Sequence, residues 1–387
     1  MEKSIDFPIK RIQLWVVLCI IAGLGLRIYQ QESLRMSSLF AIGLTLGIVL
    51  YHSSFGFTSS FRALLTDRRS AGFRAQMWML GVACCLFFPA LSQGELFGQS
   101  LGGFEAPLSV ALLIGAFLFG IGMQLGGGCG SGTLFTVGGG NTRMVLTLFF
   151  FIVGSVLGVV HRDWWDARPS IDTPTLIVAW GWPWALAVNC AVFFSAYLMA
   201  GRLELQRHGK LTSISSMQQA SLWRGQWPVL AGAIALALLN FATLLLAGRP
   251  WGITSAFGLW GGKLLQAIQV PVQHWPGYAD WQGALADSVL SDITSVMDFG
   301  IMLGAMLAAV MARKFKPGWH VSARHAAASV LGGLLLGYGA RLAYGCNIGA
   351  FFSGIASGSL HGWVWIVFAL FGNWVGIRWR PAFDLPN

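Results

Sequence analysis

Residues 120–136 read GIGMQLGGGCGSGTLFT, and residues 337–353 read GYGARLAYGCNIGAFFS. Shifted by 217 positions, the two segments match at seven of 17 positions, with Cys129 aligned on Cys346. A repeat of this quality around a cysteine rarely arises by chance, so we expect an internal duplication. Glycine leaves the backbone free to bend around each cysteine, so each half is predicted to place one thiol at an interrupted helix.

The composition indicates a membrane protein. Of the 387 residues, 55% are hydrophobic and only 10% are charged, whereas about a quarter of a soluble domain is charged. The net charge of +10 comes from basic residues in short loops beside apolar segments. This pattern is typical of orientation in a lipid bilayer rather than of nucleic-acid binding. The six cysteines lack the spacing of a disulfide framework, a zinc site or a redox motif, so no metal or cofactor is expected.

The apolar runs predict an all-α fold. A transmembrane helix needs about 20 apolar residues. Ten segments qualify, at 12–30, 37–53, 73–92, 107–126, 143–161, 183–201, 227–247, 291–313, 325–344 and 362–379. Four shorter apolar pieces follow bends rich in Gly, Ser and Thr, at 55–65, 129–138, 252–266 and 346–358. We interpret these four as re-entrant half helices, which membranes tolerate where they line protein or a water-filled cavity.

The loop charges predict which loops share a side of the membrane. Basic residues are concentrated in the segments 62–74, 202–224 and 313–324, which we therefore expect in the cytoplasm. The loops at 93–106 and 267–290 carry acidic residues and are expected outside. Ten spans arranged in this way place both termini in the cytoplasm.

A second repeated element relates FGFTSSF at 55–61 to WGITSAF at 251–257. Equivalent loops of the two halves carry opposite charge signatures, so we expect two repeats that are inverted in the membrane. Inverted repeats with broken helices are typical of transporters whose substrate site lies near the midplane. The predicted division is an additional N-terminal transmembrane helix at 1–36, a first repeat at 37–161, a linking helix and basic cytoplasmic loop at 162–226, a second repeat at 227–380 and a tail at 381–387.

The half helices are predicted to direct their N-termini at the membrane centre. Their free backbone N–H groups and dipoles would form an anion site there. Cys129 and Cys346 are the predicted central thiols, and a soft, weakly hydrogen-bonding thiol suits a sulfur-containing anion. The other candidate substrate-binding residues are Gly128, Gly130, Ser131, Gly345, Asn347, Thr58, Ser59, Thr254, Ser255, Gln124 and Arg341. Gln124 and Arg341 precede the two cysteines by five residues and are candidate donors; alternatively, Arg341 extends to the outer interface.

A membrane thiol enzyme, either a sulfurtransferase or a redox carrier, is the alternative function. Such an enzyme needs a base or an activating cation beside its thiol. No His, Asp or Lys lies within ten residues of Cys129, and Arg341 is the candidate near Cys346. We therefore predict a transporter with no catalytic residue.

The segments GGGCGSGTLF at 126–135 and YGCNIGAFFSGIASGSLHGW at 344–363 resemble the YeeE/YedE family of bacterial sulfur-transport membrane proteins. The resemblance extends over residues 37–380. It implies uptake of a small sulfur oxyanion across the bacterial inner membrane, with thiosulfate as the first candidate. It also implies that the ion passes between the thiols of Cys129 and Cys346. It also implies a cytoplasmic sulfur-carrier protein as a partner. The family's thiosulfate transporters have a further cysteine in the first short-helix region. Residues 56–60 contain none, so a selenium compound or another sulfur compound stays open as substrate.

Overall fold

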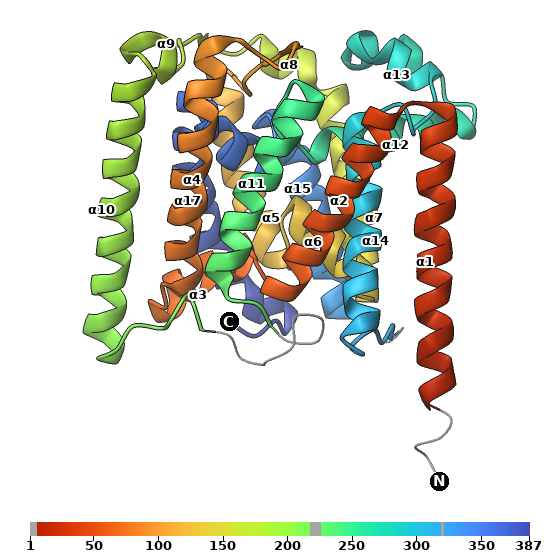
Figure 1. The fold of residues 1–387 in the computed structure, drawn as a ribbon, viewed down its shortest axis with the longest axis horizontal. Helices are drawn as coiled ribbons and strands as arrows, with labels where there is room; N and C mark the ends of the chain where they lie inside the picture. Colours follow the sequence, from red (N-terminus) through yellow and green to blue (C-terminus); the bar gives the residue numbers. More distant parts are fainter. Residues whose placement is uncertain (1–5, 217–225, 319–320) are drawn as a thin grey trace.

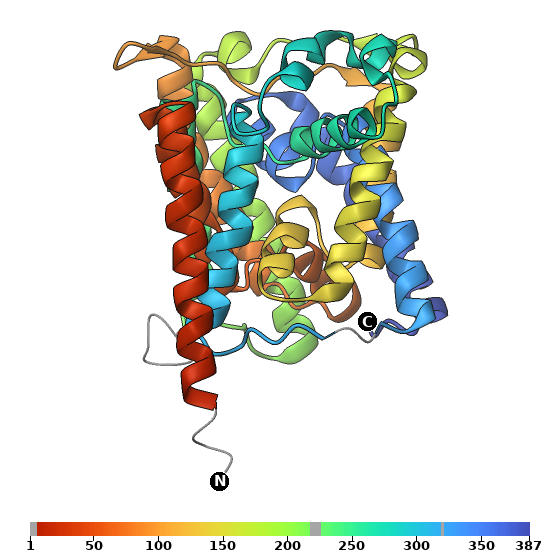
Figure 2. The same cartoon turned by 90° about the vertical axis from the view of Figure 1, so that its right-hand side faces the viewer.

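A computed structural model describes residues 6–216, 226–318 and 321–387, with side chains from Ile12 onward. The predicted basic loop at 202–224 therefore lies partly outside the described residues. Among the described residues, ten long helices form a bundle with roughly parallel axes (Figures 1 and 2). They are α1 (Asp6–Gln31), α2 (Leu34–Ser53), α4 (Ala71–Gln93), α5 (Val110–Gly126), α7 (Thr142–Val160), α10 (Trp182–His208), α11 (Val229–Ala247), α14 (Ile293–Met311), α15 (Ala323–Leu342) and α17 (Leu360–Trp379).

Four shorter helical segments lie among the long ones. They are α3 (Phe57–Asp67), α6 (Gly130–Gly138), α12 (Thr254–Ala267) and the π-helix η3 (Asn347–Ser353), which continues as α16 (Gly354–Ala356). The remaining elements are small. They are α8 (Arg162–Asp166), α9 (Leu176–Trp180), η1 (Val272–His274), η2 (Pro276–Trp281), α13 (Gln282–Ala286) and η4 (Arg380–Phe383), with the paired strands β1 (Glu95–Leu96) and β2 (Gln99–Ser100), and β3 (Leu108–Ser109) and β4 (Ser170–Ile171).

Polar residues start several of the long helices. The Ser109 side chain accepts a hydrogen bond from the Leu112 backbone at 3.0 Å and caps α5. Asn141 caps α7 in the same way, and Asp292 caps α14 through the Ser295 backbone at 2.7 Å. Each cap satisfies a backbone N–H group that the first turn of a helix leaves without a partner. The apolar runs are thereby divided into separate helices at these points.

The described residues include nine helical segments that are long and apolar enough to cross a membrane. A tenth, Ala323–Leu342 with Asn347–Ala356, qualifies as a pair bent by 40°. This confirms the prediction of an all-α polytopic membrane protein with about ten transmembrane helices. The re-entrant character of the short helices and the inverted repeats stay predictions.

The loop segments divide between the two ends of the bundle (Figure 1). The basic segments after α3, α10 and α14 lie at the end where α1 starts and where the chain ends. The hairpin of β1 and β2 lies at the opposite end, with η1, η2 and α13. The loops that the charge pattern grouped together therefore share an end of the molecule. We call the end that carries the basic segments the basic end, and the end that carries the hairpin of β1 and β2 the hairpin end.

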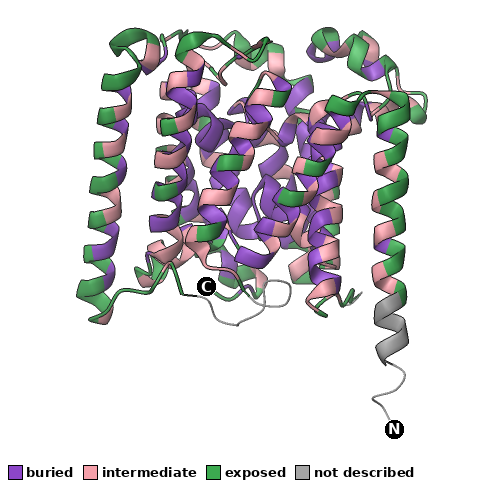
Figure 3. Ribbon diagram, in the orientation of Figure 1, coloured by how far each residue is buried: buried purple, intermediate pink, exposed green. Residues whose placement is uncertain are grey.

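Small residues allow the long helices to approach each other closely. A side chain at Gly43 or Gly47 of α2 would collide with the backbone of α14 at Met297 or Ile301. Gly337 of α15 meets the backbone of α7 at Phe151. Such contacts replace the hydrophobic driving force that is missing between helices in lipid. Figure 3 shows the buried residues gathered in the middle of the bundle, with α1 and α10 exposed at its flanks.

Candidate functional site

The two aligned cysteines begin two of the short helices. Cys129 precedes α6, and its Sγ accepts a hydrogen bond from the Gly132 backbone at 3.5 Å. Cys346 precedes η3, and its Sγ accepts one from the Ile348 backbone at 3.4 Å. Both residues are buried, with at most 1% of their surface exposed. Each thiol therefore lies where free backbone N–H groups and the positive end of a helix dipole are directed.

Three short segments meet around Gly130, the residue after Cys129. A Cβ atom built on Gly130 would lie 2.9 Å from Sγ of Cys346 and 3.4 Å from Cγ2 of Thr254. The starts of α6, η3 and α12 are therefore adjacent, although the chain separates them by more than 90 residues at each step. The structure thus brings together Cys129, Gly130, Cys346 and Thr254 from the predicted set.

Gly345 has a backbone conformation that favours glycine. Its φ is +151°, and a Cβ there would approach the Ala350 backbone nitrogen to 2.9 Å. An L-amino-acid side chain rarely fits this combination of dihedral angle and close contact. Gly345 therefore shapes the bend that places Cys346 at the start of η3.

Two polar side chains accompany the thiols. The Ser131 hydroxyl lies 3.4 Å from Sγ of Cys129. Asn347 follows Cys346 and is fully buried, and neither atom of its amide has a hydrogen-bond partner among the described residues. A buried amide without partners costs free energy unless a ligand or water satisfies it. Asn347 is therefore available to a polar ligand beside Cys346.

The first short helix contributes less directly. Phe57 of α3 packs edge-on against Phe351 of η3, with ring centroids 6.2 Å apart. The Thr58 hydroxyl is buried and has no partner in the described chain. Ser59, by contrast, is exposed and donates a hydrogen bond to the Gly56 carbonyl at 3.1 Å. The structure thus joins α3 to η3 through Phe57, and among the described contacts Ser59 has none with either thiol.

A cavity of about 470 Å³ is lined by loop residues on one side and by residues at the starts of α12 and η3 on the other. Its outer lining includes Glu105 and Asp166, and it reaches inward to Gly345 and Gly349, on either side of Cys346 in the sequence. Thr254 lines the same cavity. We call this cavity the vestibule.

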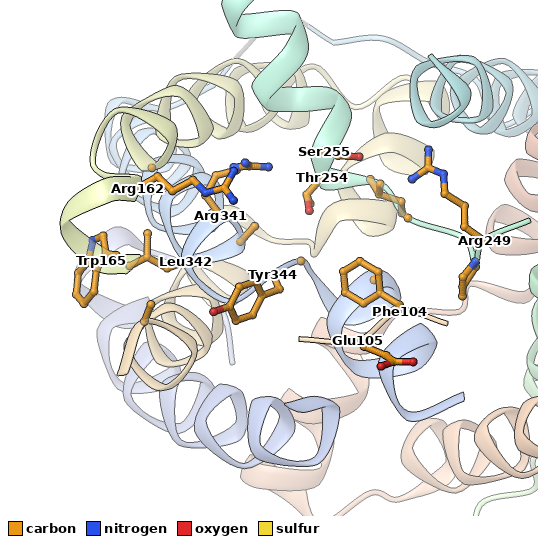
Figure 4. Close-up of a pocket in the computed structure, with 18 of the residues that line it drawn as sticks. Phe104, Glu105, Arg162, Trp165, Arg249, Thr254, Ser255, Arg341, Leu342 and Tyr344 are labelled. Carbon is orange, nitrogen blue, oxygen red and sulfur yellow. The ribbon is translucent and has the colours of Figure 1, made fainter. Parts of the chain in front are cut away.

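Three arginines line the vestibule (Figure 4). Arg162 and Arg341 lie on one side and Arg249 lies on the other, with Thr254 and Ser255 between them. Three guanidinium groups against the two carboxylates of Glu105 and Asp166 leave a positive balance in this lining. A cleft lined mainly by one sign of charge raises the local concentration of ions of the opposite sign.

Arg341 and Gln124 have different environments despite their equivalent positions in the repeat. Arg341 lies in the vestibule wall with its guanidinium 4.7 Å from the Trp281 ring, and its Nε has no hydrogen-bond partner in the described chain. Gln124 is fully buried and donates to Asn373 Oδ1 at 2.6 Å and to the Thr58 carbonyl at 3.2 Å. Its amide oxygen accepts from Arg62 at 3.3 Å. Arg341 is thus free to meet an anion, whereas Gln124 is occupied within the protein.

The sequence did not single out Arg162 and Arg249 as site residues. Both follow the end of a long helix, where a basic residue is ordinarily read as a determinant of orientation. Its position five residues before Thr254 could have indicated Arg249, because it places this arginine beside the repeated element WGITSAF at 251–257.

A family model described as "Sulphur transport" matches residues 52–375. The chain belongs to this family. Its curated relatives include the "Thiosulfate transporter TsuA" of Spirochaeta thermophila, 30% identical over 86% of this chain and 95% of the relative. A protein with the same name from Escherichia coli is 26% identical over 86% of this chain and 91% of the relative. The "Probable transporter YedE" of Escherichia coli is 35% identical over a shorter region, 41% of this chain and 40% of that protein.

These comparisons confirm the predicted family and identify the protein as a transporter rather than an enzyme. It is a multi-pass membrane protein of sulfur transport.

Proposed function

We propose that this protein takes up thiosulfate, which enters through the vestibule and leaves at the basic end of the bundle. The observation that carries the proposal is the meeting of Cys346, Gly130 and Thr254 at the inner limit of a vestibule lined by three arginines. Full-length relatives named as thiosulfate transporters favour thiosulfate over the other sulfur and selenium compounds.

The vestibule supplies the first step of the proposed path. Arg162, Arg249 and Arg341 attract a divalent anion from the solvent, and the hydroxyls of Thr254 and Ser255 replace part of its hydration shell. Because Arg341 Nε has no partner among the described residues, it can donate to the anion without breaking a hydrogen bond seen there.

The thiols supply the next step. Cys346 follows Gly345, which lines the vestibule, so its thiol meets the anion before that of Cys129. Each S–H donates a weak hydrogen bond to the anion, and the Asn347 amide and the Ser131 hydroxyl add polar contacts. Weak donors are an advantage here because an ion that crosses must also leave. No covalent bond forms between substrate and protein.

The proposed path then reaches the basic end. Thr58 in the first turn of α3 and Gly128 just before α6 are buried, whereas Ser59 is exposed. We place the basic end in the cytoplasm of a bacterial inner membrane, because short basic loops remain on that side. Both termini are then cytoplasmic, and a sulfur-carrier protein would receive the anion at this end.

We also propose that residues 37–161 and 227–380 are inverted repeats. The helix order α2, α3, α4, α5, α6, α7 has a counterpart in α11, α12, α14, α15, η3 with α16, and α17. Paired half helices with N-termini near one point are the arrangement by which inverted repeats build a substrate site. A reporter fused within residues 267–290 should respond as an extracytoplasmic one, and a cytoplasmic response would contradict the orientation.

Uptake of radiolabelled thiosulfate tests the proposed function. Cells that lack other sulfate and thiosulfate importers should accumulate the label when they produce this protein and not when they carry the empty vector. Unlabelled thiosulfate should compete more effectively than sulfate, sulfite or selenite. An absence of uptake with the protein present in the membrane would contradict the proposed function, and competition by selenite alone would contradict the substrate.

A further inference from the structure

Asp298 is a buried carboxyl group that the proposed path does not use. It lies in the second turn of α14, one of the candidate membrane-spanning helices, with 0% of its surface exposed. Neither of its carboxyl oxygens has a hydrogen-bond partner in the described parts of the chain. Ionisable residues within membrane spans are rare, and they usually face a substrate or proton pathway.

The turns above and below Asp298 show which way this face of α14 is directed. Residues four apart lie on one face of a helix. The Thr294 hydroxyl, one turn before Asp298, accepts a hydrogen bond from Ser255 at the start of α12 at 3.1 Å. Met302, one turn after it, packs against Gly138 at the end of α6. Asp298 is therefore held between α12 and α6, the two helices whose starts meet at Gly130.

The titratable groups near Asp298 can be assigned element by element. Asp292 caps the start of the same helix, α14. Among the elements packed against α14, α6 carries no titratable side chain of its own, and Lys263 of α12 is bonded to the carbonyls of Leu285 and Asp287. The other titratable side chains described on these elements are Cys19, Arg27 and Tyr29 of α1 and Arg35, Tyr51 and His52 of α2.

Arg249, in the loop before α12, donates to the Thr294 hydroxyl at 3.0 Å. Neither Arg249 nor a cation on these elements forms an ion pair or hydrogen bond with Asp298 in the described structure. A carboxylate in a low-dielectric interior without a partner costs much more free energy than the neutral acid. When the centre of the bundle is closed to water, the protein interior therefore favours the protonated carboxyl group of Asp298. A structural aspartate would instead be expected to have a partner, as Asp292 has in Ser295.

We propose that Asp298 carries a proton that accompanies the anion, so that uptake is coupled to the proton gradient. The carboxylate takes a proton from water when the centre is open to the vestibule. The neutral acid and the anion share the closed centre, and the proton leaves to water when the centre opens to the basic end. Only this O–H bond forms and breaks, and nothing is oxidised or reduced. The proton offsets one negative charge of the anion and supplies a driving force. This inference rests on the proposed function.

Purified protein in liposomes with a pH-sensitive dye inside, at a clamped membrane potential, tests the coupling. Addition of thiosulfate outside should acidify the lumen of liposomes that contain the protein. An acid-outside gradient of one pH unit should raise the accumulation of labelled thiosulfate about tenfold for each proton carried. Asp298→Asn should lose both responses while it still exchanges labelled for unlabelled thiosulfate across the membrane.

Asp292→Asn is the matched control, because asparagine also caps a helix and the change removes a carboxylate from the same helix. It should retain both responses. Thiosulfate uptake by the unmodified protein without lumenal acidification or a response to the gradient would overturn the inference and leave the proposed function standing. Coupling that persists in Asp298→Asn would also overturn it. An absence of any thiosulfate uptake by the unmodified protein would overturn both this inference and the proposed function. The measurements on the unmodified protein decide the question even if the Asp298 variant does not fold.

Discussion

The thiol of Cys346 is in contact with the position that a side chain would occupy at Gly130. A Cβ atom built on Gly130 lies 2.9 Å from Sγ of Cys346, closer than real Cβ contacts. The two cysteine motifs, which are 217 residues apart in the sequence, therefore depend on each other's backbone. The absence of a side chain at position 130 is what allows the Cys346 thiol to occupy its place.

Gly130→Ala tests this dependence. The added methyl group should displace the Cys346 thiol and narrow the junction of α6, η3 and α12, so we expect thiosulfate uptake to fall about tenfold or more. The protein should still fold, because alanine suits the start of a helix. Gly81→Ala on α4 is the control, because its Cβ would meet nothing within 4 Å. Equal uptake by the two variants at matched expression would contradict the tight contact.

Arg341→Gln should weaken the capture of the anion in the vestibule. The guanidinium lies over the Trp281 ring and presents an Nε without a partner in the described chain. Loss of one charge contact of about 1–2 kcal/mol corresponds to a KM for thiosulfate that is roughly 5–30 times higher. Arg341→Lys should recover part of the affinity, since lysine keeps the positive charge but lacks the planar set of guanidinium N–H donors. An unchanged KM in Arg341→Gln would exclude Arg341 from the path.

Gln124→Ala should act on stability rather than on substrate contact. Its amide links Asn373, the Thr58 carbonyl and Arg62, and the truncation removes the donor of the buried Asn373 Oδ1. Such a loss costs about 1–3 kcal/mol. The unfolding temperature in detergent should fall, while the KM of the remaining folded protein stays near that of the unmodified protein. A large rise in KM without a change in unfolding temperature would instead support Gln124 as a substrate donor.

The helices could be predicted from the sequence because each depends on local information. The length of each apolar run and the polar bends between runs were sufficient to predict the long helices, and they placed the start of α6 directly after Cys129. The repeated motif likewise indicated that Cys346 starts a short helix. The structure adds that this helix begins as a π-helix, a feature that the spacing of residues did not indicate.

The contents of the site were harder to predict because they depend on which helix faces which. Gln124 and Arg341 are equivalent in the repeat, yet one is occupied in the interior and the other lines the vestibule. Ser59 matches Ser255 in sequence, but it is exposed, whereas Ser255 lies in the vestibule wall. Asp298 was visible as a charge within a span, but only the packing of α14 between α12 and α6 shows what it faces.

Glu204→Gln should destabilise the basic end of the bundle. The buried Glu204 carboxylate accepts hydrogen bonds from the backbone nitrogens of Ser70 and Thr212 at 3.1 Å each, and it lies 3.5 Å from the Arg74 guanidinium. Glutamine would present an N–H group to these donors and leave Arg74 without its counter-charge. Removal of one partner of a buried pair costs about 3–5 kcal/mol, so the unfolding temperature in detergent should fall clearly.

Asp67→Asn is the control for this change. Asp67 pairs with Arg69 at 2.9 Å on the surface, where the exposed side chains remain hydrated. Exposed pairs of this kind contribute little to stability, so the unfolding temperature should change little. Similar shifts in the two variants would contradict the account of Glu204 as the anchor between α4, α10 and the following loop.

Thiosulfate uptake by the Cys346→Ser and Cys129→Ser variants is the most direct test of the central claim that both thiols contact the passing ion. Cys85→Ser, an exposed cysteine of α4, is the control for loss of a thiol elsewhere. At matched amounts of folded protein in liposomes, we predict that either central substitution lowers the initial rate at least tenfold, while Cys85→Ser retains the rate of the unmodified protein. Undiminished uptake by both Cys346→Ser and Cys129→Ser would contradict the thiol path.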